Sequence, residues 1–283
     1  MLRLVKVIRL LWALISRTPY VNWKASMRSG ADELQYRAHR IQVGCTLLCD
    51  ILGIDVHTEG AVPSQSGMLV VSNHFGVLDP LILASVIPSA PVGHAGMTHW
   101  PLVGWVSLAH GMVPVERERR SAVARFAHLV RERLEAGVHV VVFPEGTTSG
   151  ELEVRPFKTG AFEAIAGLHD RWVLPVYLAV DSIGGGPATG AARRRVVWAG
   201  GEQSFQAHAL ALVALDHMSF TVRIGAPIPV RGRDRKELAQ VAREAVEHLR
   251  THGETIHTAK SVTMDAGART RLRPRSHSQK MDE

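Results

Sequence analysis

The sequence predicts an α/β domain with a largely parallel central sheet flanked by helices, and with membrane-interface helices at its N-terminus. Short runs of consecutive apolar residues, typical of strands buried on both faces, alternate with longer segments of helical periodicity. Of the 283 residues, 46% are hydrophobic and 21% are charged, which is the composition of a globular domain with a sizeable core. A fibrous or wholly disordered protein is therefore excluded.

The first elements follow from apolar spacing and from capping residues. Residues 34–53 carry apolar side chains at helical spacing, and residues 68–71 form an unbroken apolar run that predicts a buried strand. A helix over 81–86 is expected next, because Asp79 is a favourable N-cap and Pro80 is a favourable first helical residue.

The later elements continue the alternation. A short strand at 111–115 precedes a helix at 121–136, which Ser121 caps and Gly137 ends. The same periodicities predict strands at 138–143, 172–180, 195–198 and 220–224, and helices at 160–168 and 234–250. The glycine-rich residues 184–187 have neither dinucleotide-binding nor P-loop spacing, so we interpret them as a loop.

Positive charge is concentrated at the two ends of the chain. Residues 1–40 contain eight basic residues (Lys or Arg) and two acidic residues. Residues 260–283 contain six basic residues and three acidic residues. Since the formal net charge is +7, the residues between the two ends sum to −2. A nucleic-acid-binding domain would carry its positive charge on the folded region, so no nucleic-acid partner is expected.

The first end has the pattern of a basic amphipathic helix. Arg3, Lys6, Arg9 and Arg17 fall within a sector of about 120° of a helical projection, and most apolar side chains lie outside it. We interpret this helix as lying in an anionic membrane interface. A surface helix packed on its own domain is one alternative. A signal peptide is another, although the apolar run is short and no small-residue cleavage site follows.

The chain divides into three predicted parts. Residues 1–33 form the membrane-interface segment, residues 34–252 the α/β domain, and residues 253–283 a disordered basic tail. No run of 18 uncharged apolar residues is present, so we expect a peripheral or monotopic protein on the cytoplasmic face of a membrane. Cys45 and Cys49, the two cysteines, are interpreted as core residues.

Two polar segments follow predicted strands. After residues 68–71 comes Ser-Asn-His-Phe-Gly-Val-Leu-Asp-Pro, in which His74 and Asp79 are too far apart in angle to meet on one helix. A loop at His74 followed by a helix from Asp79 turns the imidazole back onto the carboxylate, which gives an oriented general base. After the strand at 138–143 comes Pro-Glu-Gly-Thr-Thr-Ser, which alone is equally typical of a polar turn.

Together the two segments resemble the glycerolipid acyltransferase family, most closely its 1-acylglycerol-3-phosphate acyltransferase branch. The matching residues are Asn73-His74 with Asp79, Phe143-Pro144-Glu145-Gly146-Thr147, a block over 111–117 that ends in Arg117, and Val173-Leu174-Pro175-Val176. The resemblance implies that His74 takes the proton of a lysolipid hydroxyl, while Asp79 holds the imidazole. The alkoxide then attacks the thioester of acyl-CoA or acyl carrier protein, with no cofactor and no metal. The implied substrate-binding residues are Asn73, Arg117, Glu145, Gly146, Thr147, Thr148 and Lys158.

Thr148 departs from the pattern of this branch, which has an arginine after Glu-Gly-Thr. A threonine cannot make the bidentate, charged contact that an arginine makes with phosphate. Either Arg119, Arg120 or Lys158 compensates and the acceptor is 1-acylglycerol-3-phosphate, or the acceptor is another lysolipid, such as a lysophospholipid or a lyso-ornithine lipid. An inactive lipid-binding scaffold is a further alternative, against which the intact His74, Asp79 and Glu145 argue.

Overall fold

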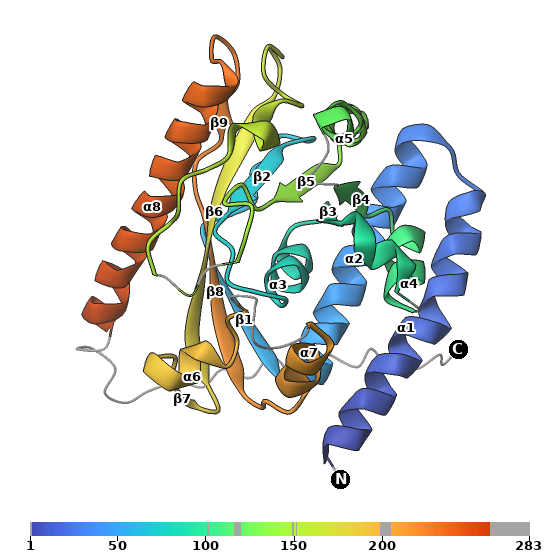
Figure 1. The fold of residues 1–283 in the computed structure, drawn as a ribbon, viewed down its shortest axis with the longest axis vertical. Helices are drawn as coiled ribbons and strands as arrows, with labels where there is room; N and C mark the ends of the chain where they lie inside the picture. The colour runs from blue at the N-terminus through green and yellow to red at the C-terminus, as the bar shows by residue number, and fades with distance from the viewer. Residues whose placement is uncertain are drawn as a thin grey trace, which may run out of the picture.

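The computed structural model describes residues 2–100, 102–115, 120–148, 150, 152–198 and 205–260. Its centre is a nine-stranded sheet whose main path runs in the order β1-β8-β6-β2-β5-β3-β4 (Figure 1). The strands are β1 (Ile54–Glu59), β2 (Leu69–Ser72), β3 (Ser89–His94), β4 (Val113–Val115), β5 (His139–Val142), β6 (Trp172–Ile183), β7 (Gly186–Pro187), β8 (Met218–Ile224) and β9 (Ile228–Pro229). The helices are α1 (Leu2–Ser26), α2 (Gly30–Leu52), α3 (Asp79–Val86), α4 (Val103–Ala109), α5 (Arg120–Glu135), α6 (Gly190–Arg194), α7 (Phe205–Val213) and α8 (Arg235–Lys260), with 3₁₀ turns η1 (Ala95–His99) and η2 (Thr159–Phe162).

The predicted largely parallel sheet is confirmed. β2 pairs in parallel with both β5 and β6, β3 with both β4 and β5, and β1 with β8. The antiparallel pairs all involve β6, which pairs with β7, β8 and β9. Both parallel neighbours of β2 run to the same edge of the sheet, so the loops that follow these strands leave side by side.

Helices cover both faces of the sheet (Figure 1). On β2, Leu69 and Val71 pack into the core beneath α5 and α8, whereas Met68 and Val70 pack into the core beneath α2 and α3. Because side chains alternate between the faces of a strand and both faces are covered, the strand reads as a continuous apolar run. α1 lies outside α2 and packs against it (Figure 1).

Two predicted elements are wrong. Residues 160–168 are not an α-helix, because only the 3₁₀ turn η2 and further turns form there, with Phe162 and Ile165 buried in the core. Residues 195–198 are not a strand, and the backbone N–H of Trp198 instead donates to the carbonyl oxygen of Phe75. In both segments apolar residues are buried without regular structure, so apolar spacing alone was misleading.

Smaller corrections concern the element ends. α3 begins at Asp79 itself, with Leu78 in the capping position, and α5 begins one residue before Ser121. The predicted domain boundary at 33/34 falls inside α2, and the boundary at 252/253 falls inside α8. Residues 261–283 of the predicted tail lie outside the described residues.

The N-terminal helix carries a buried lysine and an exposed apolar face. Nζ of Lys6 lies 2.5 Å from Oδ1 of Asp216 and donates hydrogen bonds to the carbonyl oxygens of Leu52 and Leu215. The expectation that Lys6 faces anionic lipid is therefore wrong, because its charge is paired inside the domain. The exposed side of the same helix consists of Leu4, Val5, Ile8, Leu11, Trp12 and Ile15. Among the described residues, no helix combines the length and the hydropathy needed to cross a bilayer.

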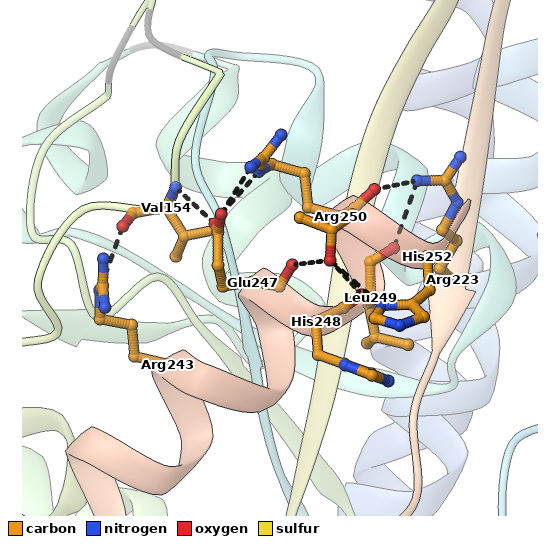
Figure 2. Close-up of polar contacts among 9 residues, drawn as sticks. Val154, Arg223, Arg243, Glu247, His248, Leu249, Arg250 and His252 are labelled. Carbon is orange, nitrogen blue, oxygen red and sulfur yellow. Dashed lines mark hydrogen bonds and ion pairs between the residues drawn. The ribbon is translucent and has the colours of Figure 1, made fainter. Parts of the chain in front are cut away.

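α8 anchors the segment that follows the second polar turn (Figure 2). The backbone N–H of Val154 donates to Oε2 of Glu247 at 3.1 Å, and Nε of Arg243 donates to the carbonyl oxygen of Val154 at 3.1 Å. Arg223, which is buried on β8, donates to two backbone carbonyl oxygens of α8 (Figure 2). α8 is therefore hydrogen-bonded both to β8 of the sheet and to the segment around Val154.

Candidate active site

The two polar segments meet beyond the carboxyl ends of β2 and β5. These strands are adjacent, with Val70 opposite Val141, so the loops after them leave the same edge of the sheet. The backbone N–H of His74 in the first loop donates to Oε1 of Glu145 in the second, at 3.3 Å. The contact joins residues that are 71 apart in the sequence.

His74 and Asp79 form the expected pair. Nδ1 of His74 lies 2.7 Å from Oδ2 of Asp79, because the loop after β2 folds back over the first turn of α3. An ionised carboxylate can only accept a hydrogen bond, so Nδ1 carries the proton in the neutral imidazole. Nε2 is then left with a free lone pair, on a ring that lines a cavity. This is the arrangement required of a general base.

The carboxylate of Asp79 is held by the loop as well as by the imidazole. Its Oδ2 also accepts hydrogen bonds from the backbone N–H groups of Phe75, at 2.5 Å, and Gly76, at 2.8 Å. The residue is 2% exposed, so these contacts replace the water that would otherwise solvate the charge. Asp79 therefore fixes the shape of the loop and the orientation of the imidazole together.

A cavity of about 520 Å³ lies beside this pair. Its lining includes Thr147 and Thr148 from the second polar segment, and Phe143 directly after β5. The Phe143 ring is stacked on the His74 ring, with 4.1 Å between centroids and 16° between planes. The stacking restrains the plane of the imidazole ring.

The other predicted residues of the second segment lie around the turn. Glu145 is buried and does not line the cavity, and its Oε1 accepts a hydrogen bond from the His74 backbone. Gly146 has a φ of 73°, and a Cβ there would lie 2.6 Å from Nζ of Lys158. A side chain at position 146 would therefore displace that ammonium group. Lys158 itself stays exposed beside the turn, outside the cavity lining.

Asn73 has a structural contact in place of the predicted substrate contact. Its Nδ2 donates to the carbonyl oxygen of Leu178, and its Oδ1 accepts from the Leu178 N–H, at 3.0 Å and 2.8 Å. Both ends of the buried amide are thus used to join the loop to β6. Arg117 and Arg119 lie outside the described residues, and only the backbone of Arg120 is described.

Sequence reasoning missed most of the cavity wall. Phe143 belongs to the second polar block that the sequence analysis identified. Its stacking on His74 depends on the register of β2 and β5, which no neighbouring residues in the sequence indicate. The remaining wall comes from β3, η1 and the segment after α6, and includes His94, Met97, Trp100 and Trp198. Among the described residues, no group of three His, Cys, Asp or Glu side chains is arranged to hold a metal ion.

The chain is similar to a curated lipid acyltransferase over most of its length. A family model described as Acyltransferase matches residues 53–179, which include both polar segments. The lyso-ornithine lipid O-acyltransferase of Brucella abortus is 30% identical over 210 residues, which are 72% of this chain and 78% of that protein. This chain belongs to the acyltransferase family.

This acyltransferase is also similar to two proteins named for 1-acylglycerol-3-phosphate acylation. The 1-acyl-sn-glycerol-3-phosphate acyltransferase of Neisseria meningitidis is 31% identical over 136 residues, which are 48% of this chain and 52% of that protein. The crystal structure of the 1-acyl-sn-glycerophosphate acyltransferase from Thermotoga maritima matches with a TM-score of 0.65 and 20% identity, over 89% of this chain and 95% of that one. The mostly parallel α/β fold is therefore shared with that enzyme.

Proposed function

We propose that this acyltransferase moves a fatty acyl group from a thioester to the free hydroxyl of a lysolipid, with His74 as the general base. The observation that carries the proposal is the 2.7 Å contact between Nδ1 of His74 and Oδ2 of Asp79, on a ring that lines the 520 Å³ cavity. It leaves Nε2 able to accept the proton of a hydroxyl group. The acyl donor would be acyl-CoA or an acyl carrier protein.

The proposed reaction balances with one proton carried by His74. Nε2 removes the hydroxyl proton as the oxygen attacks the thioester carbonyl carbon, and the C–S bond then breaks. The departing thiolate takes the proton back from the imidazolium, whose charge Asp79 stabilises meanwhile. Neither Cys45 nor Cys49 lines the cavity beside His74, and burial raises the thiol pKa of Cys45 to about 12 and that of Cys49 to about 11, which disfavours the nucleophilic thiolate.

For the acceptor, we favour a lyso-ornithine lipid. Thr148 lines the cavity at the position where an arginine would bind a phosphomonoester. The Brucella abortus relative, named for a lyso-ornithine lipid, also matches more of this chain than the Neisseria meningitidis relative does. The second candidate is 1-acylglycerol-3-phosphate, for which the ammonium group of Lys158, beside Gly146, is a cation among the described residues of this turn.

Thr148→Arg is expected to shift acceptor preference toward 1-acylglycerol-3-phosphate. A charge-assisted hydrogen bond contributes about 1.5–3 kcal/mol, which corresponds to about 10–100-fold in the ratio of kcat/KM for the two acceptors. The measurement is acyl transfer by purified protein to lyso-ornithine lipid and to 1-acylglycerol-3-phosphate. Thr147→Arg is the matched control for added charge, with a smaller shift expected. An unchanged ratio in Thr148→Arg would remove Thr148 from the head-group site.

We further propose that α1 lies in the membrane interface on the cytoplasmic face, with its exposed apolar side inserted. Replacing Ile8, Trp12 and Ile15 with serine is expected to weaken vesicle binding about 100-fold, since each half-exposed side chain contributes about 1 kcal/mol on burial. They are 55%, 66% and 53% exposed. Sedimentation with anionic vesicles measures the effect. Leu152→Ser, at an equally exposed leucine away from α1, serves as control, and equal binding by both variants would contradict the proposal.

A further inference from the structure

A second cavity lies between α1, α2 and α4. Its volume is about 180 Å³, and its walls are mostly aliphatic, including Leu14, Val21, Ile41, Leu48 and Met112. A dry aliphatic cavity of about 150 Å³ is enough to bind benzene, so this one has room for a hydrocarbon segment. It shares no lining residue with the cavity beside His74.

Met112 separates the two cavities. Its side chain lines the second cavity, and its sulfur packs so closely on Gly93 that a Cβ at position 93 would lie 2.4 Å from it. Gly93 lines the cavity beside His74. A ligand in the second cavity is therefore divided from the reacting groups by this side chain and by β3.

Gly44 faces the second cavity without a backbone reason to be glycine. It lies in the middle of α2, where glycine costs about 1 kcal/mol relative to alanine. Its φ is not positive, and a Cβ built there would meet no atom within 4 Å. No close approach of another element requires the missing side chain. What the glycine does provide is open space in the cavity wall.

One end of the second cavity is cationic, and its described lining contains no carboxylate. Arg17 and Arg40 both line it, and Nε of Arg40 is buried without a hydrogen-bond partner among the described residues. Nδ1 of His110 is unpartnered in the same way, while its Nε2 lies 3.4 Å from Oγ1 of Thr18. Burial and the charges of Arg37 and Arg40 lower the pKa of His110 to about 4, so this imidazole is neutral at pH 7.

The neighbouring arginine, Arg37, already has an anionic partner and a hydrogen-bond acceptor. Arg37 forms an ion pair with Glu33 at 2.8 Å and also donates to the carbonyl oxygen of Ala109. Among the residues that the structure describes, no carboxylate pairs with Arg40. A partly buried guanidinium without an anion is costly, and a carboxylate is the group whose geometry fits it best. The positive charge of Arg40 and the aliphatic walls therefore fit a ligand that has an anionic head group and a single hydrocarbon chain.

We propose that this cavity binds a fatty acid, with the chain among the aliphatic walls beside Gly44 and the carboxylate on Arg40. The site is independent of the transfer reaction, because none of its residues lines the cavity beside His74. A neutral lipid would leave the cationic end unpaired, and a two-chain lipid exceeds a volume of about 180 Å³.

The experiment is calorimetric titration of the full-length protein with octanoate below its micelle concentration. We expect 1:1 binding, with 1-octanol and butyrate each bound at least about 10-fold more weakly, since one lacks the charge and the other lacks the chain. Equal affinity for 1-octanol would overturn the proposed role of Arg40. Tighter binding of a single-chain phosphate ester than of the carboxylate would overturn the choice of a fatty acid.

Variants locate the ligand. Gly44→Phe fills the cavity and is expected to abolish octanoate binding, whereas Gly44→Ala is the matched control and is expected to bind octanoate with unchanged or raised thermal stability. Arg40→Gln removes the charge and is expected to weaken binding about 10–100-fold. His74→Ala is expected to bind octanoate as the unaltered protein does. Binding that survives Gly44→Phe but is lost in His74→Ala would place the octanoate at the reaction site and overturn the proposal.

Discussion

His74→Ala is expected to lower kcat for acyl transfer by about 10²–10⁴-fold while the protein remains folded, because the variant has no base at the position of Nε2. The imidazole contributes one contact to the carboxylate of Asp79, and the Phe75 and Gly76 amides retain theirs, so the loop is expected to keep its shape. Circular dichroism and thermal unfolding establish folding, and initial rates at saturating acceptor establish kcat.

A second imidazole in the same cavity provides the control. His94 also lines the cavity, but its Nδ1 accepts a hydrogen bond from the Gly96 N–H, and it has no carboxylate partner among the described residues. His94→Ala is therefore expected to change kcat by less than about 10-fold. Turnover by folded His74→Ala at the unaltered rate would exclude His74 as the general base.

Asp79→Asn is expected to lower kcat by about 10²–10⁴-fold with little change in KM. The asparagine oxygen can still accept from the two backbone amides, so the loop is kept. The negative charge that stabilises the imidazolium is lost, and the tautomer of His74 is no longer fixed. The double variant with His74→Ala is expected to be no slower than the slower single variant, because the two residues act as a unit. Additive losses would show that Asp79 acts separately from His74.

Asp216→Asn is the matched control for loss of a carboxylate. Asp216 pairs with Lys6 and does not line the cavity beside His74, so this change is expected to lower thermal stability and leave kcat unchanged. Asp79→Ala is expected to lower stability as well as kcat, since it leaves two buried N–H groups unpaired at about 1–3 kcal/mol each.

The core of the site was predictable because its signals are local. The strands before both polar segments are buried apolar runs, and Pro80 starts a helix that turns the carboxylate of Asp79 back to His74. Adjacency of the two segments follows from the rule that loops after parallel neighbours share one edge. The hydrogen bond from the His74 N–H to Glu145 shows that the two loops do lie side by side.

What was not predictable depends on partners that are distant in the sequence. The sequence alone allows the amide of Asn73 to bind either substrate or backbone. In the structure it binds the backbone of Leu178, which is 105 residues away in the sequence. Trp198 joins the cavity wall because its segment pairs with the loop at Phe75 rather than with the sheet. Neither of these two contacts produces a periodic pattern of residues from which it could be predicted.

The pairing of Lys6 with Asp216 has a consequence for the order in which the molecule is made. The two residues are 210 positions apart. At about 5–20 residues per second, a ribosome takes roughly 10–40 s to reach the partner. Throughout that interval the emerged N-terminal helix has α2 to pack against but lacks its acidic partner and α7. The contact of Lys6 with Asp216 can therefore form only after the packing of α1 on α2 has become possible, and the domain leaves the apolar side of α1 uncovered before and after that contact forms.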